Sequence, residues 1–247
     1  MELLMIGHLL GDFYFQTDNI SEQKRVSLKY LLLHAVLYMT AVYCAVIFAT
    51  GVAGEYLRSM IILGALHMAI DWIKIIIEKK FKTLEKYKLT ILVIDQLIHI
   101  WILWTFFSHG LGKTDFKWFS ESFVNQISEY WIVVIAALLC GKPAAIVVAL
   151  VFERIPKSLQ KADEQVNQTE SLKIGSWVGI LEREIILILG LLGQFGAIGF
   201  VLAAKSLARH SQLNNQAFAE KYLVGTLLSS FIALSNVAMC LCLKGMR

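Results

Sequence analysis

Histidine and aspartate recur in pairs within hydrophobic segments of this chain, and each pair is spaced four residues apart. The pairs are His8/Asp12, His67/Asp71 and Asp95/His99, and a fourth histidine, His34, lies in the remaining apolar segment of the same half. Side chains at i and i+4 leave one face of a helix about one turn apart, which suits two ligands that share a metal ion. A charged carboxylate at the centre of a membrane helix costs roughly 2.5–3.5 kcal/mol, so three of them need partners. The pattern therefore predicts a buried polar site, and a metal site in particular.

The residue types indicate which metals would bind. Imidazole and carboxylate together suit zinc, manganese or iron. The predicted metal ligands are His8, Asp12, His34, His67, Asp71, Asp95 and His99, and the three aspartates are also the predicted catalytic groups. This set exceeds what one tetrahedral ion needs, so the sequence leaves open whether one or two divalent ions bind. Residues predicted to hold these ligands by hydrogen bonds, or to neutralise them, are Gln16, Asp18, Lys74 and Gln96.

Membrane helices are the elements that must position these residues. Hydrophobic residues make up 57% of the 247-residue chain, and the mean hydropathy is +0.63. Apolar runs near the roughly 20 residues needed to cross a bilayer recur along it. The sequence predicts an all-α, polytopic membrane protein with about eight transmembrane helices, at residues 2–17, 28–50, 59–78, 89–108, 130–152, 176–193, 197–209 and 222–243. Segment 197–209 is short enough to be re-entrant instead.

Basic residues indicate how these helices are oriented. Lysine and arginine concentrate in alternate connections, at residues 17–29, 79–88, 153–174 and 205–221. Under the positive-inside rule this predicts a multi-pass protein of the inner (cytoplasmic) membrane, with an outside N-terminus and cytoplasmic basic loops. Lys244 and Arg247 are exceptions, because they would lie outside. Because this rule explains the basic loops, we expect no nucleic-acid partner.

The same orientation predicts that the histidine–aspartate pairs converge. The first and third segments run inward and carry histidine before aspartate, whereas the fourth runs outward and carries Asp95 before His99. All three aspartates then lie nearer the cytoplasm and the paired histidines lie deeper. His34 falls level with the aspartates. Scattered polar residues would rarely produce this inversion, so we expect a single site.

The chain is predicted to have two halves. Residues 1–110 form a four-helix His/Asp-rich domain, residues 130–247 form a second helical half, and residues 157–174 form a cytoplasmic linker. In the second half, Arg183, Lys205 and Arg209 are predicted to bind an anion, supported by Glu182 and Glu220. The alternative is that Arg183 pairs with Glu220 or Glu184 and that the other cations only reach the membrane surface. Gly141-Lys142-Pro143 predicts a kink in the fifth apolar segment.

The motifs resemble those of a widespread bacterial membrane family. They are His8-Leu-Leu-Gly-Asp12-Phe-Tyr-Phe-Gln16-Thr-Asp18, His34, His67 to Asp71 with Lys74, and Asp95-Gln96 to His99; the second half also looks like the longer members. The N-terminal domain of that family is a domain of unknown function, sometimes encoded beside SatD-like proteins. The resemblance implies a membrane protein but no activity. A looser similarity to inner-membrane metal-dependent hydrolases concerns only the type of site.

Three functions follow from these observations. The first is a metal-dependent hydrolase of a lipid-linked or phosphate-bearing substrate, an amphiphilic or anionic small molecule. The second is a transporter that moves divalent metal ions or protons through the same residues. The third is a structural or signalling subunit whose linker binds a cytoplasmic partner. The lipid bilayer and a second copy of the chain are further expected partners.

Overall fold

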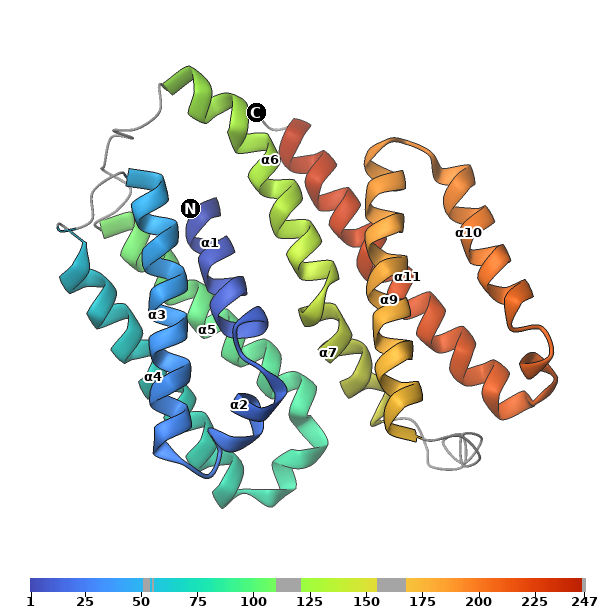
Figure 1. Cartoon of the computed structure of the whole chain (residues 1–247), viewed down its shortest axis with the longest axis horizontal. Helices are drawn as coiled ribbons and strands as arrows, with labels where there is room; N and C mark the ends of the chain where they lie inside the picture. Colours follow the sequence, from blue (N-terminus) through green and yellow to red (C-terminus); the bar gives the residue numbers. More distant parts are fainter. Residues whose placement is uncertain (51–53, 55, 110–120, 155–167, 246–247) are drawn as a thin grey trace. The chain divides into compact units, whose positions relative to one another are not determined.

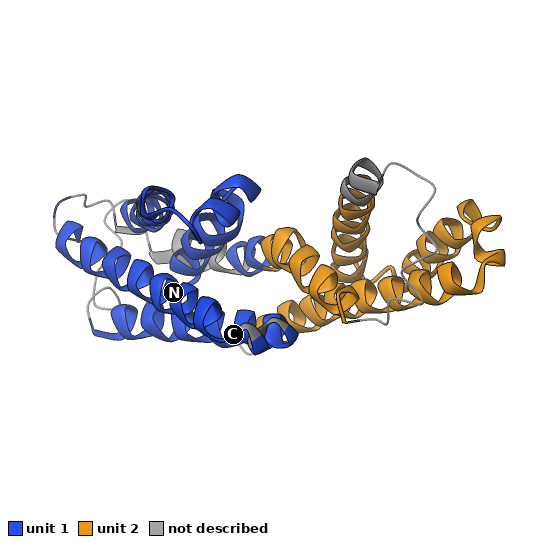
Figure 2. Ribbon diagram, turned by 90° about the horizontal axis from the view of Figure 1, so that it is seen from below, with its two compact units in different colours: residues 1–135 blue, residues 136–247 orange. Residues whose placement is uncertain are grey.

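Helices account for every regular element that the structure describes. The computed structural model describes residues 1–50, 54, 56–109, 121–154 and 168–245, and within these ranges no strand occurs. This confirms the all-α prediction (Figure 1). The chain divides into two compact units, residues 1–135 and 136–247 (Figure 2). The predicted linker lies partly outside the described residues, and from Gln168 onward it is helical.

The first unit contains all the histidine–aspartate pairs. Its elements are α1 (Glu2–Leu9), a π-helical turn η1 (Leu10–Tyr14), α2 (Asp18–Gln23), α3 (Leu28–Thr50), α4 (Leu57–Lys80), a 3-10 helix η2 (Lys82–Tyr87) and α5 (Lys88–His109). Helix α6 (Glu121–Cys140) continues from this unit into the second. Tyr38, Val42 and Met60 are among the buried residues that pack the core of the unit. Helices α1, α3, α4 and α5, together with η1, thus supply the ligands predicted from the sequence.

Five segments of the described chain are long and apolar enough to cross a membrane. They are Leu28–Phe48, Leu57–Lys80, Lys88–His109, Tyr130–Phe152 and Gln216–Lys244. The predicted count of eight is not confirmed. The α-helix and π-turn at the N-terminus end at Tyr14, α9 (Gln168–Leu191) carries charged residues at its centre, and α10 (Phe195–Ala208) has only 14 residues.

Two glycines let the N-terminal helix approach α3 closely. A Cβ atom added at Gly7 would lie 3.0 Å from the Cα of Val42, and one added at Gly11 would lie 2.9 Å from the Cα of Tyr38. A real Cβ essentially never lies as close to backbone as at Gly11, and at Gly7 the neighbouring helix would have to shift, so glycine at these positions allows the close packing. Asp12 follows Gly11 directly, so this contact also positions the first predicted carboxylate.

We expect the substitution Gly11→Ala to destabilise the first unit by about 1–3 kcal/mol, because the added methyl group overpacks the α1–α3 contact. Thermal unfolding in detergent micelles measures the effect. Gly199→Ala is the matched control, since Gly199 is helical and no atom lies within 4 Å of an added Cβ. That control should be neutral or gain about 0.5–1 kcal/mol from helix propensity. Equal melting temperatures for the two variants would contradict the close approach.

The second unit is built around an interrupted helix. Its described elements are the end of α6, α7 (Lys142–Phe152), α9, α10, a 3-10 helix η5 (Gln212–Asn214) and α11 (Gln216–Gly245). Gly141 has φ −74° and ψ −120°, which is not helical, and Pro143 lies in the first turn of α7. Proline cannot donate the hydrogen bond that a continuous helix would need, so the predicted kink is present as a break.

Candidate metal centre

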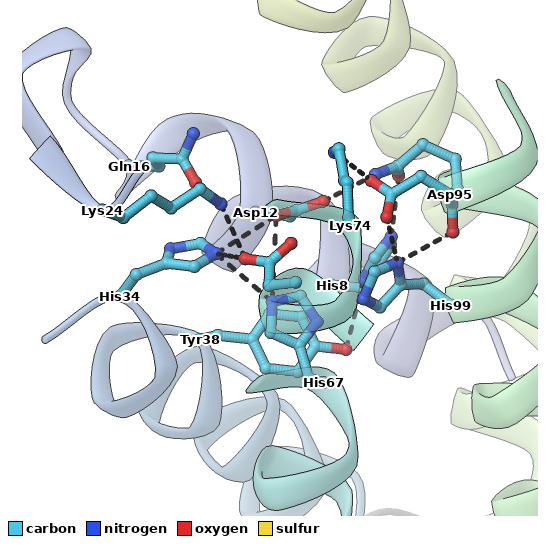
Figure 3. A network of polar contacts seen from close by, with 12 residues as sticks. His8, Asp12, Gln16, Lys24, His34, Tyr38, His67, Lys74, Asp95 and His99 are labelled. Carbon is cyan, nitrogen blue, oxygen red and sulfur yellow. Dashed lines mark hydrogen bonds and ion pairs between the residues drawn. The ribbon is translucent and has the colours of Figure 1, made fainter. Parts of the chain in front are cut away.

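All seven predicted ligands are buried in the first unit. His8, His34, His67 and His99 are at most 2% exposed, and the three aspartates at most 9%. Figure 3 shows the side chains of the four histidines, Asp12 and Asp95 directed toward one another from α1 and η1, α3, α4 and α5, and Asp71 Oδ2 lies 3.3 Å from His34 Nε2. The structure therefore brings together the residues that the spacing selected, while their roles remain predictions.

Three of these side chains have the separations that a single metal ion requires. His34 Nε2 lies 3.2 Å from His67 Nε2 and 3.4 Å from Asp12 Oδ1, and His67 Nε2 lies 3.9 Å from Asp12 Oδ1. Bonds of about 2.1 Å at tetrahedral angles place ligand atoms about 3.4 Å apart. Two imidazoles and a carboxylate also form a ligand set that suits zinc. The residues present thus fit a divalent transition metal.

A second group of potential ligands shares a member with the first. Ligand atoms of His67, Asp71 and His99 lie within 4.8 Å of one another. His99 Nδ1 is 2.8 Å from the carbonyl oxygen of Asp95. Because a carbonyl only accepts, Nδ1 carries the proton and neutral His99 offers a bare lone pair on Nε2. A histidine held by its other nitrogen in this way is typical of metal ligands.

Several buried polar atoms of the cluster have no hydrogen-bond partner among the described residues. They are His34 Nδ1, His67 Nδ1, His99 Nε2 and Asp95 Oδ1. Each such atom costs about 1–3 kcal/mol when it is left unsatisfied. A network that only held the helices together would be expected to pair them. His99 Nε2 is therefore available to an ion held by the second group, His67, Asp71 and His99.

A chain of hydrogen bonds orients Asp12. The amide nitrogen of Gln96 donates to Asp12 Oδ2 (2.7 Å), so the amide oxygen of Gln96 accepts from His8 Nε2 (3.1 Å). His8 Nδ1 then accepts from the hydroxyl of Tyr38 (3.2 Å). Both ring nitrogens of His8 are occupied. His8 thus contacts Asp12 through Gln96 in this structure, and its role as a ligand stays a prediction.

Sequence reasoning did not select Tyr38. Its ring stacks on that of His67, with centroids 3.6 Å apart and planes 7° from parallel. Tyr38 follows His34 by four residues, the same spacing that singled out the other pairs, so this signal could have found it.

Two lysines bind the remaining carboxylates. Lys24 Nζ donates to Asp71 Oδ2 (2.6 Å) and to Gln16 Oε1 (2.9 Å). Lys74 Nζ donates to Asp95 Oδ2 (2.6 Å), which is the neutralising role the sequence predicted for it. Lys24 was interpreted only as a loop cation, because nothing in its local sequence indicates that it turns inward.

The other predicted supporting residues lie elsewhere. Asp18 begins α2 and is exposed. In the second unit, Glu182 forms an ion pair with Lys205 of α10, and exposed Glu220 accepts a hydrogen bond from Gln216. These residues are not among the contacts of the cluster.

The predicted anion-binding cations of the second unit also have protein partners. The guanidinium of Arg183 is buried and donates to the carbonyl oxygens of Cys140 and Gly141 and to the hydroxyl of Ser229. Arg209 lies over the ring of Phe218. These three hydrogen bonds tie Arg183 to the helix break, while its predicted roles in anion binding or in an ion pair stay predictions.

We expect Gln96→Leu to weaken metal binding about 10- to 100-fold, because Asp12 loses the donor that orients it. Competition with a fluorescent chelator, on protein purified in detergent, measures the affinity. Gln212→Leu is the control, since Gln212 is exposed in the second unit. An unchanged affinity in Gln96→Leu would contradict the positioning role.

A family model described as "Protein of unknown function (DUF3307)" matches residues 1–128, which is more than half of the chain. The chain belongs to the DUF3307 family. The match confirms the predicted resemblance to an uncharacterised domain, and it covers every member of the cluster described above. Comparisons with curated proteins and with solved structures find no match. For the DUF3307 domain, a functional proposal therefore depends on the chemistry of the histidine–aspartate cluster.

Proposed function

We propose that this membrane protein binds one divalent transition metal ion in its first unit and uses it to hydrolyse a lipid-linked or phosphate-bearing substrate. The observation that supports the proposal is the set of separations among Asp12 Oδ1, His34 Nε2 and His67 Nε2. Three protein ligands leave a fourth tetrahedral position for water or substrate, which is the pattern of catalytic zinc sites.

Charge favours one ion over two. The cluster contains three carboxylates, Asp12, Asp71 and Asp95, and two ammonium groups, Lys24 and Lys74. With neutral histidines the sum is one negative charge. One dication brings it to one positive charge, whereas two would leave three positive charges in a low-dielectric site, at a large cost. Both candidate groups also need His67, and a neutral imidazole binds one ion.

The ligand chemistry supports hydrolysis. A divalent metal polarises a phosphoryl oxygen and lowers the pKa of water. Of the aspartates, Asp95 has a buried Oδ1 with no hydrogen-bond partner among the described residues. We propose Asp95 as the group that accepts a proton from the attacking water, with Asp12 and Asp71 nearer the ion.

Metal content tests the first part of the proposal. Protein purified in detergent should contain about one equivalent of zinc, manganese or iron by mass spectrometry. His34→Ala should lose it, and His210→Ala should keep it, because His210 is exposed in the second unit. Folded wild-type protein that takes up no metal would overturn the proposal.

Hydrolysis, the second part of the proposal, is tested with a defined substrate. Metal-loaded protein should release phosphate from dihexanoyl phosphatidate, a soluble lipid phosphomonoester, whereas His34→Ala should not. Asp95→Asn should retain the metal and lose turnover. Turnover that persists in both variants would show that the cluster is not the catalytic site.

A second candidate function is transport of divalent metal ions or protons. The observation that favours it is that the two candidate ligand groups share His67, so an ion could pass from Asp12 and His34 to Asp71 and His99. Metal flux into proteoliposomes without hydrolysis of any phosphoester would establish this function in place of the first.

The proposal includes a location. We infer that the protein lies in the inner membrane with its N-terminus outside and its basic connections cytoplasmic, because those connections alternate along the chain. Self-association is a further proposal, which chemical crosslinking in membranes tests. Protease accessibility of tags at the two ends tests the orientation.

A further inference from the structure

Lys24 and Lys74 are the most exposed charged groups of the cluster. The Lys24 and Lys74 side chains are 11% and 22% exposed, whereas those of His34 and Asp71 are 1% and 3% exposed. Figure 3 shows both lysine side chains reaching the carboxylates. A molecule that approaches the ligand set past Lys24 or Lys74 therefore meets an ammonium group before it reaches the imidazoles.

A surface pocket is lined by two residues that follow these lysines in the chain. Arg25, Ile75, Glu78 and Lys79 line it, and Arg25 and Ile75 directly follow Lys24 and Lys74 in the chain. Arg25 pairs with Glu78 at 3.3 Å. Two of the residues that line the pocket are cations, Arg25 and Lys79, and one is an anion, Glu78.

The charge of the cluster changes sign when a metal binds. Without metal the three carboxylates outnumber the two ammonium groups, so the cluster repels anions. With one dication the sum is positive by one charge, and in a buried site that charge calls for a compensating anion. An ion that draws Asp71 toward itself also frees Lys24 Nζ, which now donates to Asp71 Oδ2.

We propose that the metal-loaded cluster binds an oxyanion, the phosphate group of a substrate, and that Lys24 and Lys74 hold it against the metal. The inference rests on the proposed metal site and names the residues of the first unit that recognise its substrate. The sequence assigned anion binding to Arg183, Lys205 and Arg209, whereas this proposal assigns it to two lysines that contact the cluster itself. The same chemistry suits a lipid phosphate headgroup and free phosphate.

Isothermal titration of detergent-purified protein with inorganic phosphate tests the proposal. We expect zinc-loaded protein to bind phosphate roughly 5- to 150-fold more tightly than zinc-free protein, and phosphate to raise zinc affinity by the same factor. Lys24→Gln and Lys74→Gln should each weaken phosphate binding at least tenfold and retain zinc, which also reports that they are folded. Lys29→Gln is the matched control, because Lys29 is exposed at the start of α3.

The outcomes separate this inference from the function it extends. Zinc uptake without phosphate binding, or lysine variants that bind phosphate like wild type, overturns the inference and leaves the metal site standing. A chain that takes up no zinc overturns both. Dihexanoyl phosphatidate that binds more tightly than inorganic phosphate supports a lipid headgroup as the source, and the reverse order supports free phosphate. Dihexanoyl phosphatidylcholine, whose headgroup is zwitterionic with no net charge, is the control.

Discussion

His67→Ala is expected to reduce metal binding to background. His67 belongs to both candidate ligand groups, so its loss removes a ligand wherever the ion lies. Loss of a supporting partner alone weakens metal sites about 10- to 100-fold, and loss of a ligand should exceed that. Metal content after dialysis and chelator competition measure the effect.

Controls separate ligation from packing. His67 stacks on Tyr38, so His67→Gln, which keeps more of the side-chain volume, should lose the metal with a melting temperature closer to wild type. His109→Ala should keep the metal, because His109 is exposed at the end of α5. Metal bound at wild-type affinity in both His67 variants would rule out the proposed centre.

Single variants of the other histidines then locate the ion. An ion at the first group is lost with His34→Ala and kept with His99→Ala, since His34 belongs to the first group and His99 to the second. An ion at the second group gives the opposite result. Loss in both variants would indicate that the ion uses ligands from both groups.

Arg183→Met is expected to destabilise the second unit by about 2–4 kcal/mol. The buried guanidinium is the hydrogen-bond donor to the carbonyl oxygen of Cys140 (2.5 Å) and to the hydroxyl of Ser229 (3.2 Å). Removing one partner leaves a buried acceptor unsatisfied, at about 1–3 kcal/mol for each group. Arg183→Lys should be intermediate, because one ammonium cannot reach three acceptors in the geometry of a guanidinium.

Thermal unfolding in detergent, followed by circular dichroism, measures this loss. Arg58→Met is the control, since Arg58 is exposed near the start of α4. Metal content should be unchanged in Arg183→Met, because all the proposed ligands lie in the first unit. A variant as stable as wild type would show that Arg183 does not hold the helix break.

Local features of the sequence predicted the helices and the histidines and aspartates of the cluster. Long apolar runs and the four-residue spacing of His67 and Asp71 depend only on neighbours in the chain, and so does the break before Pro143. The predicted count of eight transmembrane helices is not confirmed. Length and charge decide whether a helix can cross a membrane, and α9 carries Glu182, Arg183 and Glu184 at its centre.

Residue types and spacing alone determined that histidines and aspartates would gather in apolar helices, because an unpaired charge there is too costly to leave alone. Only the tertiary structure decided which partner each of these side chains contacts. Gln96 lies 88 residues from His8 and occupies its Nε2, and Lys24 lies 47 residues from Asp71 and pairs with it. Packing between helices sets such partners, because it fixes the direction of each side chain. No local sequence pattern encodes that direction, yet it determines which histidine nitrogen remains available to a metal.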